Sequence, residues 1–405
     1  MLCLTSASAI RRGMKFLTFA LCIIALIPAQ ARAEDYSASV LVSFDARMIK
    51  PVITKGFADP FTKRAVTIDD PVRVASVSKL VVALGVMRLV DKRVLDLDKD
   101  VSDYLGWQLR NPTFPDRPIT LRLLLSHRSS LTDGADYLIP LGDTVRARVG
   151  AAGAWDASHA PGAYFRYTNL NFPIVASVME AVTGERFDRL IARLVLQPLR
   201  LDACFNWTMC SDAVVARAVV LTDGAGAVRR DNLQGKRPDC PVVSAADGNC
   251  DLGKYMPGSN GALFSPQGGL RISMRGLAKV AQVLLRRGRG FLSPASYRTM
   301  TTPLWRFDGS NGETEGGFWC SYALAVQTLA SGAAGCKDDP FGDKGQRIGH
   351  PGEAYGLRSG LWVDPATGKG TAYFITAVAD DAPKGVSAFN AVEEALLQSQ
   401  TVVRK

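Results

Sequence analysis

The stretch RVASVSKLVVALGVMRLV, residues 73–90, decides the fold of this 405-residue chain. From Val77 to Val90, apolar side chains occupy positions almost all the way around a helix, which indicates a core helix rather than an amphipathic surface helix. The polar residues Ser76 and Lys79 stand at its beginning. Because a helix that is apolar all round must be covered on every side, the flanking elements are expected to enclose it.

Strand patterns lie on both sides of this helix in the sequence. Residues 38–58 alternate like two paired strands and end at Gly56. Four more strand-like runs follow later in the chain, at 321–328, 344–350, 358–364 and 371–378. Strands at both ends with helices between them predict one α/β domain, built from both ends of the chain, into which a helical region is inserted.

Helical patterns occupy most of the remaining sequence. The further helices that we expect are 174–182, ending at Gly184; 187–195, stopped by Pro198; 273–285; and an acidic amphipathic helix at 386–398. The stretch 204–268 is polar, glycine-rich and cysteine-bearing. We therefore assign a sheet domain to residues 34–75 and 260–405, and a mostly helical region with disulfide-bearing loops to residues 76–259.

The first residues have the layout of a secretory signal peptide. Three basic residues precede the apolar run 16–27, and the small-residue site 31–33 follows. A membrane anchor is the alternative, but a helix that spans a bilayer needs about 20 apolar residues and this run is shorter. We expect cleavage after Ala33, no membrane span in the mature chain, and a periplasmic or secreted protein. Translation starts at Met1 or Met14.

Export changes the charge of the mature chain. Removing residues 1–33 leaves 44 basic against 38 acidic residues, so the formal net charge falls from +10 to +6. A mild basic excess without runs of lysine or arginine is typical of solvated surface charge and does not predict nucleic-acid binding. The partner that we expect is a small-molecule or short-peptide substrate. The sequence leaves the oligomeric state open.

Six cysteines remain after the signal peptide. An even number in an oxidising compartment predicts disulfides. Six cysteines allow many pairings, and close spacing favours Cys204–Cys210, Cys240–Cys250 and Cys320–Cys336. No C-x-x-C motif occurs, which argues against zinc and redox roles.

Familiar catalytic signatures are absent from the sequence. The chain has three histidines, and it has no H-E-x-x-H, Walker A or G-x-S-x-G motif. We therefore expect no metal site and no cofactor. A Ser-His-Asp triad stays open, but no feature of the sequence indicates its serine.

The first motif that carries chemistry is Ser76-Val77-Ser78-Lys79. Ser76 lies at or near a helix N-terminus, where free backbone N–H groups and the helix dipole favour a developing anion. The i,i+3 spacing brings Lys79 to the same face, within reach of the Ser76 hydroxyl. The alternative is an N-cap serine and a solvated lysine, but the apolar run after Lys79 argues against solvation.

Two more motifs occur once each. In Y-T-N, the side chains of Tyr167 and Asn169 point the same way if the loop is extended, so a phenol and a carboxamide can face one site. In H-P-G, His350 is expected at the end of a strand, where Gly352 lets the backbone come close to a ligand. Taken singly, the tyrosine is better interpreted as core or surface packing, and a histidine at a strand end is often structural.

These three motifs, in this order, resemble those of the serine β-lactamase and penicillin-binding-protein superfamily. The chain is most similar to the class C β-lactamase-related hydrolases, which include D-alanyl-D-alanine carboxypeptidases, D-amino-acid amidases and esterases. Flanking segments agree along most of the mature chain, at 73–75, 123–131, 161–162, 268–270 and 363–365. The combination is far more specific than any single motif.

The resemblance implies a β-lactamase/transpeptidase-like α/β (α+β) fold: an antiparallel β-sheet flanked by helices, with an inserted all-helical region. It implies that Ser76 is the acylated nucleophile, and that Lys79 and Tyr167 are the proton-handling pair. Which of the two is the base stays open, because a buried ammonium beside a phenol shifts both pKa values and the pair titrates as one unit.

The resemblance also implies the substrate-binding residues. Asn169 would bind the acyl-side amide or carbonyl of the substrate, and Gly352 would line the substrate strand. The backbone N–H groups of Ser76 and Glu353 would form the oxyanion hole. His350 would stand where β-lactamases carry the basic residue of their K-T-G motif.

The third motif departs from the family pattern in two positions. His350 replaces the lysine of K-T-G and supplies positive charge only partly near neutral pH, and Pro351 offers neither a hydroxyl nor a backbone N–H. We therefore expect an exported serine hydrolase that forms an acyl-serine intermediate on small esters, amides or peptides. The alternatives are a β-lactamase or D,D-carboxypeptidase and, in another class, a non-turnover penicillin-binding or sensor-like protein.

Overall fold

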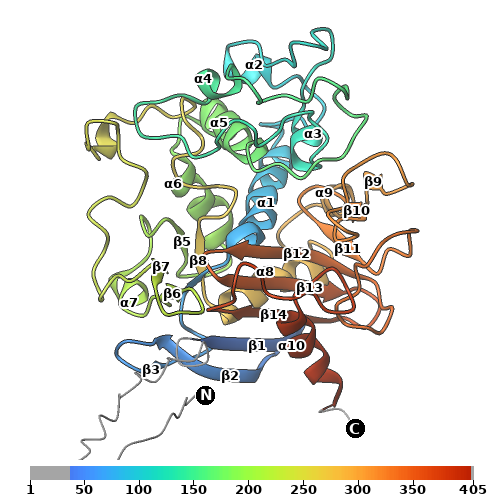
Figure 1. Ribbon diagram of the computed structural model, residues 1–405. Helices are drawn as coiled ribbons and strands as arrows, with labels where there is room; N and C mark the ends of the chain where they lie inside the picture. Colours follow the sequence, from blue (N-terminus) through green and yellow to red (C-terminus); the bar gives the residue numbers. More distant parts are fainter. Residues whose placement is uncertain (1–36, 403–405) are drawn as a thin grey trace, which may run out of the picture. The chain divides into compact units, whose positions relative to one another are not determined.

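The large β-sheet takes strands from both ends of the chain. A computed structural model of the protein describes residues 37–402, and side chains as far as residue 399. Within these residues, strands pair antiparallel in the order β3-β2-β1-β14-β13-β12-β11-β10-β9 (Figure 1). The strand bounds are β1 Ala38–Asp45, β2 Ile49–Asp59, β3 Arg64–Ala65, β9 Trp305–Arg306, β10 Ser321–Tyr322, β11 Gln327–Leu329, β12 Arg347–Ala354, β13 Leu357–Asp364 and β14 Lys369–Ile375. The predicted antiparallel sheet is confirmed.

Helices flank this sheet and also occur through residues 76–259, all within one compact unit of the chain. Their bounds are η2 Ala75–Val77, α1 Ser78–Asp91, α2 Ser102–Leu105, α3 Leu121–Leu125, α4 Val145–Val149, α5 Asn171–Thr183, α6 Phe187–Ile191, η3 Ala192–Leu196, α7 Asp212–Val215, η4 Leu252–Lys254, α8 Met274–Leu285, α9 Pro294–Thr301 and α10 Ala391–Val402. Residues 76–259 are not purely helical, because short strands also occur among them. Two small sheets also occur, with strands β4 Val72–Arg73, β8 Leu270–Ile272 and β5 Cys204–Phe205 in one, and β6 Leu221–Thr222 and β7 Val228–Arg230 in the other.

The two faces of the large sheet pack against different helices. In β1, Val40 and Val42 belong to the main core together with the buried side chains of α8. The residue between them, Leu41, packs in a second cluster with Leu396 and Leu397 of α10. This alternation is the period of two expected for a strand that is covered on both faces.

Helix α1 is the buried helix that the sequence predicts. Its residues from Ser78 to Met87 are all buried, and Arg88 and Val90 are among the few that are not. Figure 1 shows α1 between the sheet and the group of α2 to α5. Because η2 directly precedes α1, the segment that carries Ser76 lies where the sheet meets the inserted region.

Two strand predictions differ from the structure in detail. β2 continues past Gly56, because this glycine adopts φ +85° and a side chain there would collide with the Ser37 carbonyl oxygen. The run 321–328 forms two short strands, β10 and β11, rather than one. The turn between them includes Ala325 at φ +53°, whose backbone N–H donates to the Leu125 carbonyl at 2.8 Å.

The last helix begins later than the amphipathic pattern indicates. α10 starts at Ala391 rather than at 386. The Glu394 carboxylate accepts the backbone N–H groups of Val386, at 2.9 Å, and Ser387. These bonds hold the residues before the helix as a loop that caps its first turn.

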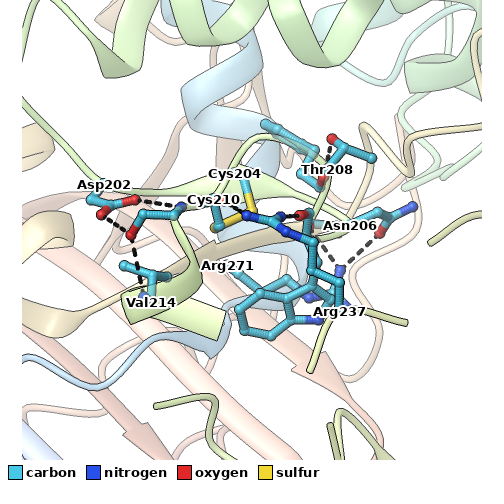
Figure 2. Close-up of a disulfide and its surroundings, with 12 residues drawn as sticks. Asp202, Cys204, Asn206, Thr208, Cys210, Val214, Arg237 and Arg271 are labelled. Atoms are coloured by element: carbon cyan, nitrogen blue, oxygen red, sulfur yellow. Dashed lines mark hydrogen bonds between the residues drawn. A yellow bond between two sulfur atoms is a disulfide. The ribbon is translucent and has the colours of Figure 1, made fainter. Parts of the chain in front are cut away.

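The favoured cysteine pairing is confirmed. The disulfides are Cys204–Cys210, Cys240–Cys250 and Cys320–Cys336. Figure 2 shows the first of them, with Arg237 lying across its loop. The Arg237 guanidinium donates to the carbonyls of Trp207, at 2.7 Å, and Cys210.

The remaining predictions concern membrane-spanning helices, metal-binding groups and the signal peptide. Among residues 37–402, no helix is both long enough and apolar enough to cross a membrane. The same residues contain no group of three or more His, Cys, Asp or Glu side chains that could hold a metal ion. The expected signal peptide, residues 1–33, lies outside the described residues.

Candidate active site

The Ser76 turn is a strained piece of backbone at the start of a buried helix. Ala75 adopts φ +44°, in the left-handed region that alanine rarely enters, and η2 follows from Ala75 to Val77. Ser76 is partly exposed, while its neighbours in the turn are buried. Such strain persists only where the surrounding structure fixes it, and it is concentrated at functional sites.

Lys79 reaches back to Ser76 as the i,i+3 spacing predicts. Its side chain is fully buried, and Nζ lies 3.0 Å from the Ser76 Oγ. Nζ also donates to Asn169 Oδ1 at 2.8 Å and to the backbone carbonyl of Gln267 at 2.9 Å. The amine therefore contacts three oxygen atoms and no carboxylate.

The surroundings of Lys79 favour its neutral form. Burial lowers the pKa of Lys79 to about 7, the charge of Asp133 acts in the opposite direction, and the charge of Arg73 lowers it further. An ordinary lysine stays protonated until pH 10.4 or so. Near neutral pH, an appreciable fraction of Lys79 is therefore an amine with a free lone pair.

Tyr167 lies against the same lysine. Lys79 Nζ is 4.9 Å from the centre of the Tyr167 ring, and this ring stacks on Trp319 with centroids 4.3 Å apart. Burial raises the pKa of Tyr167 well above its usual value, and the nearby Ser76 side chain acts to lower it; among residues 37–402 the buried Tyr167 hydroxyl has no hydrogen-bond partner. The phenol therefore keeps its proton across the pH range in which Lys79 titrates.

Asn169 connects Lys79 to a carboxylate. Its Oδ1 accepts from Lys79, while its Nδ2 donates to Asp133 Oδ2 at 3.0 Å and its backbone N–H donates to the same oxygen at 2.9 Å. The other Asp133 oxygen accepts the Leu170 N–H at 2.9 Å. Asp133 thus orients the Asn169 amide so that its oxygen faces Lys79.

The strand that carries the third motif runs beside the Ser76 turn. A side chain at Gly352 would come within 2.4 Å of the Val74 carbonyl oxygen and 3.2 Å of the Ser76 nitrogen. Ser359, which pairs with Gly352 across the sheet, donates from Oγ to the Val74 carbonyl at 3.0 Å. Glycine is needed here because the nucleophile turn rests directly on the sheet.

β12 does not end at His350, as the sequence suggested, but continues to Ala354. On one side it pairs with β13 along its whole length from Ile348, and on the other β11 reaches only as far as Gly349. The second half of β12 therefore has no strand neighbour on that side among residues 37–402. Pro351 is tolerated because no second ladder requires its missing N–H.

His350 is fully buried, and both of its ring nitrogens are hydrogen-bonded. Nδ1 lies 2.6 Å from the Pro351 carbonyl oxygen, so it carries the proton, and Nε2 accepts from the Tyr322 hydroxyl at 2.8 Å. Burial lowers the pKa of His350 to about 3, and the nearby Lys79 acts in the same direction. The imidazole is thus neutral near pH 7 and is not exposed to a substrate carboxylate.

Glu353, the remaining residue of the predicted site, follows Gly352 on β12. Its side chain is exposed and pairs with Arg358 at 2.9 Å. The structure therefore brings Ser76, Lys79, Tyr167 and Asn169 into one cluster of side chains, with the backbone of residues 352–353 beside it.

Comparisons with known proteins agree with this arrangement. A family model described as Beta-lactamase matches residues 30–395. The chain belongs to the Beta-lactamase family.

Two curated members of the wider group are similar to parts of this Beta-lactamase family chain. The D-alanyl-D-alanine-carboxypeptidase/endopeptidase AmpH of Escherichia coli (strain K12) is 28% identical over 137 residues, which are 33% of this chain and 36% of AmpH. Esterase EstB of Burkholderia gladioli is 30% identical over 168 residues, 37% of this chain and 42% of EstB. The matches thus span less than half the length of these relatives.

Solved structures extend the likeness to nearly the whole fold. D-amino acid amidase from Ochrobactrum anthropi SV3 has a TM-score of 0.63 at 18% identity, covering 91% of this chain and 94% of the amidase. A penicillin-binding protein homologue from Pyrococcus abyssi also gives 0.63, at 19% identity, over 92% of this chain and 74% of that protein. At these identities the likeness concerns the β-lactamase/transpeptidase-like fold.

This Beta-lactamase family site also contains groups that the motifs did not reveal. Asp133 acts on Asn169 from 36 positions earlier in the chain, and the Gln267 contact is made by a backbone carbonyl, which has no sequence signature. Trp319 stacks on Tyr167 from the residue before the Cys320–Cys336 disulfide. The glycine pair that follows Gln267 and the disulfide beside Trp319 were the only local signals.

His127 supports the Y-T-N segment from behind. It is buried, its ring lies 4.4 Å from that of Tyr167, and its Nδ1 accepts from the Thr168 N–H at 3.0 Å and from Asn171 Nδ2 at 3.1 Å. Burial lowers its pKa well below the usual value. A neutral histidine with its Nδ1 engaged in this way positions the segment.

Proposed function

We propose that the protein is an exported serine hydrolase that acts through an acyl-serine intermediate on small esters, amides or short peptides. The observation that carries the proposal is the 3.0 Å contact between Lys79 Nζ and Ser76 Oγ. This distance lies within the range of about 2.6–3.2 Å required of a general base. Membership of the Beta-lactamase family supports the same reaction class.

Lys79 acts as the base for acylation. Asn169 Oδ1 and the Gln267 carbonyl can only accept hydrogen bonds, so they take the two N–H groups of a neutral amine. The lone pair is then left for the third neighbour, the Ser76 hydroxyl. The pKa of Lys79, lowered by burial to about 7, matches this task, because a base works best when its pKa lies near the operating pH.

Attack by Ser76 Oγ on the substrate carbonyl forms a tetrahedral oxyanion. The backbone N–H groups of Ser76 and Glu353 are the donors that would stabilise it, because Gly352, the residue before Glu353, lies beside the Ser76 nitrogen. Loss of one such donor costs about 3–4 kcal/mol in acyl-transfer enzymes. Gly352 keeps this approach open, since it has no side chain to obstruct the turn.

The leaving group departs on the Tyr167 side of Ser76. Lys79 holds the proton taken from Ser76, and the phenol of Tyr167, which stays protonated, can relay a proton to the leaving oxygen or nitrogen and recover one from Lys79. Water then attacks the acyl-enzyme by the reverse route. Asn169, fixed by Asp133, orients the amine and meets the acyl side of the substrate.

A carboxylate on the leaving group is not part of the substrate that we propose. The buried His350 is neutral, and the carboxylate of Glu315 lies near enough to Tyr167 to raise its pKa together with burial. Both features disfavour the anionic leaving-group side of β-lactams and D-alanyl peptides. They favour esters and simple amides over β-lactamase or D,D-carboxypeptidase activity.

We also propose a periplasmic or secreted location. Three disulfides are stable in an oxidising compartment, and the N-terminal sequence has the layout of a signal peptide.

The test uses the mature chain, a fluorophosphonate probe, and a panel of 4-nitrophenyl esters, D-amino-acid amides and nitrocefin. The wild type should be labelled and should turn over esters, and Ser76→Ala should lose both, with kcat falling by about 10⁶-fold. Ser78→Ala is the matched control, because Ser78 is buried, donates nothing to the site, and accepts the Leu270 N–H at 3.0 Å. Full turnover by Ser76→Ala would end the proposal. A lasting adduct on Ser76 without steady-state product would favour the non-turnover, sensor-like alternative.

A further inference from the structure

Arg73, three residues before the nucleophile, is a buried cation without a counter-ion. Only 6% of the residue is exposed, and its Nε and Nη1 atoms have no hydrogen-bond partner. Within residues 37–402 it takes part in no ion pair. Burying an unpaired guanidinium opposes folding strongly, so its retention beside Ser76 calls for a functional reason.

The nearest charged side chains do not neutralise Arg73. It pairs across β4 and β8 with Arg271, a like charge. The carboxylate of Asp231 is taken by Arg271, through Nη2 at 2.9 Å and Nε at 3.2 Å, and Asn206 Oδ1 accepts from Arg271 Nη1 at 2.8 Å. Figure 2 shows Arg271 in this position, close to the Cys204–Cys210 disulfide. The group therefore keeps one uncompensated positive charge, at Arg73.

A second arginine faces the same aromatic ring. The Arg73 guanidinium lies 5.0 Å from the centre of the Tyr355 ring, and the Arg230 guanidinium lies 5.3 Å from it. Arg230 is exposed on β7 and, like Arg73, takes part in no ion pair among the residues described. The carboxylate of Glu353, the residue after Gly352, pairs with Arg358 at 2.9 Å and so neutralises neither arginine.

The position of Tyr355 relative to Ser76 defines the part of the substrate concerned. Along β12, Gly352 lies beside the Ser76 nitrogen, His350 lies on the Tyr167 side, and Tyr355 follows in the opposite direction. The leaving group needs a proton and therefore lies toward Tyr167. The acyl group must then extend toward Tyr355 and the two arginines.

We infer that the acyl part of the substrate ends in a carboxylate, which Arg73 and Arg230 bind beside the Tyr355 ring. Arg73 supplies the buried charge, and Arg230 closes the subsite from the solvent side. This inference rests on the proposed function and names its substrate class: half-esters or half-amides of dicarboxylic acids. The site then binds an anion on the acyl side, whereas β-lactamases bind one on the leaving-group side.

The test compares two esters with one leaving group, 4-nitrophenyl hydrogen glutarate and its neutral methyl ester. For the wild type, kcat/KM should be at least about tenfold higher for the acid, as a charged hydrogen bond in a desolvated site would give. Arg230→Gln should remove most of this preference, by lowering kcat/KM for the acid several-fold more than for the neutral ester. Arg73→Gln should remove the rest, and its folding is checked by thermal unfolding.

Arg229→Gln is the matched control, because Arg229 is an exposed neighbour on β7 that pairs with Asp223 at 3.1 Å. It removes the same charge and should leave the preference intact. Equal rates for the two esters in the wild type, or equal effects of Arg230→Gln on both, would overturn the inference. Failure of the wild type to hydrolyse either ester would instead count against the proposed function. Because Arg230 is exposed, its variant decides the question even if Arg73→Gln does not fold.

Discussion

Two nitrogen bases are buried beside the same serine, and the structure treats them differently. Lys79 and His350 are both fully inaccessible, and burial lowers both pKa values, to about 7 and about 3. Lys79 meets two oxygen acceptors and one hydroxyl, so its neutral form has a lone pair directed at Ser76. The His350 nitrogens are both engaged, by Tyr322 and by its own strand.

The difference lies in the partners rather than in the depth of burial. Asp133 counteracts the desolvation of Lys79 and keeps its pKa in the physiological range, whereas no carboxylate does this for His350. Lys79 is therefore arranged to exchange a proton, and His350 is arranged to hold a neighbouring tyrosine. The motif position that carries a cation in the resembling β-lactamases carries here a neutral histidine that accepts a hydrogen bond from Tyr322.

The largest effect is expected when the amine of Lys79 is removed. Lys79→Met should lower kcat by about 10³-fold with little change in KM, because a general base typically contributes 10²–10⁴-fold. Lys79→Arg should be equally inactive, since a guanidinium keeps the charge but does not deprotonate in proteins. Stopped-flow or steady-state kinetics with a 4-nitrophenyl ester give kcat and KM for both variants. An active Lys79→Arg enzyme would mean that Lys79 acts as a charge and not as a base.

An intermediate effect is expected from the carboxylate that tunes Lys79. In the wild type, kcat/KM should rise with pH through about 7, because only the neutral amine accepts the Ser76 proton. Asp133→Asn removes the charge that raises the Lys79 pKa, so the rise should move to lower pH. The plateau should fall about tenfold as Asn169 loses a charged acceptor.

Asp136→Asn serves as the control for this variant, because Asp136 is exposed nearby and accepts only the Leu138 N–H at 2.8 Å. It should leave both the plateau and the midpoint unchanged. A midpoint that does not move in Asp133→Asn would contradict the electrostatic role of this carboxylate.

The smallest effect is expected at the other buried base. His350→Gln should change kcat/KM less than about threefold, and equally for substrates with and without a carboxylate on the leaving group, since a neutral imidazole is being exchanged for a neutral amide. Stability should fall by about 1–3 kcal/mol if the Tyr322 hydroxyl loses its buried partner. A selective loss of activity on carboxylate-bearing leaving groups would restore His350 as a cation.

Local patterns in the sequence predict the geometry within each pair of site residues, although their roles came from the resemblance. The i,i+3 spacing of Ser76 and Lys79 and the i,i+2 spacing of Tyr167 and Asn169 each fix a geometry within one element, and both pairs meet at Lys79. The apolar helix and the alternating strands were predictable for the same reason. Each depends on side-chain periodicity alone.

Contacts between distant segments were not predictable in this way. Nothing near Asp133 in the sequence indicates that it would accept a hydrogen bond from Asn169. Likewise, the charge of Arg73 is left without a counter-ion because Arg271 binds the carboxylate of Asp231, and no local pattern predicts that. His350 is buried because aromatic rings from distant segments, those of Tyr167, Trp319 and Tyr322, surround its imidazole. The strand pattern alone stopped at the proline, because a missing N–H matters only where a second strand requires it.

The pairing of β1 with β14 also constrains how the enzyme matures. Ser39 is opposite Ile375, so β1, which is synthesised early, can pair only after β14 has been synthesised near the end of translation. Contacts of such long range form slowly, and until then the sheet lacks the pair that joins its N-terminal strands to its C-terminal strands. If the chain is exported unfolded, as we propose, it would therefore lack an assembled site until almost all of it had crossed the membrane.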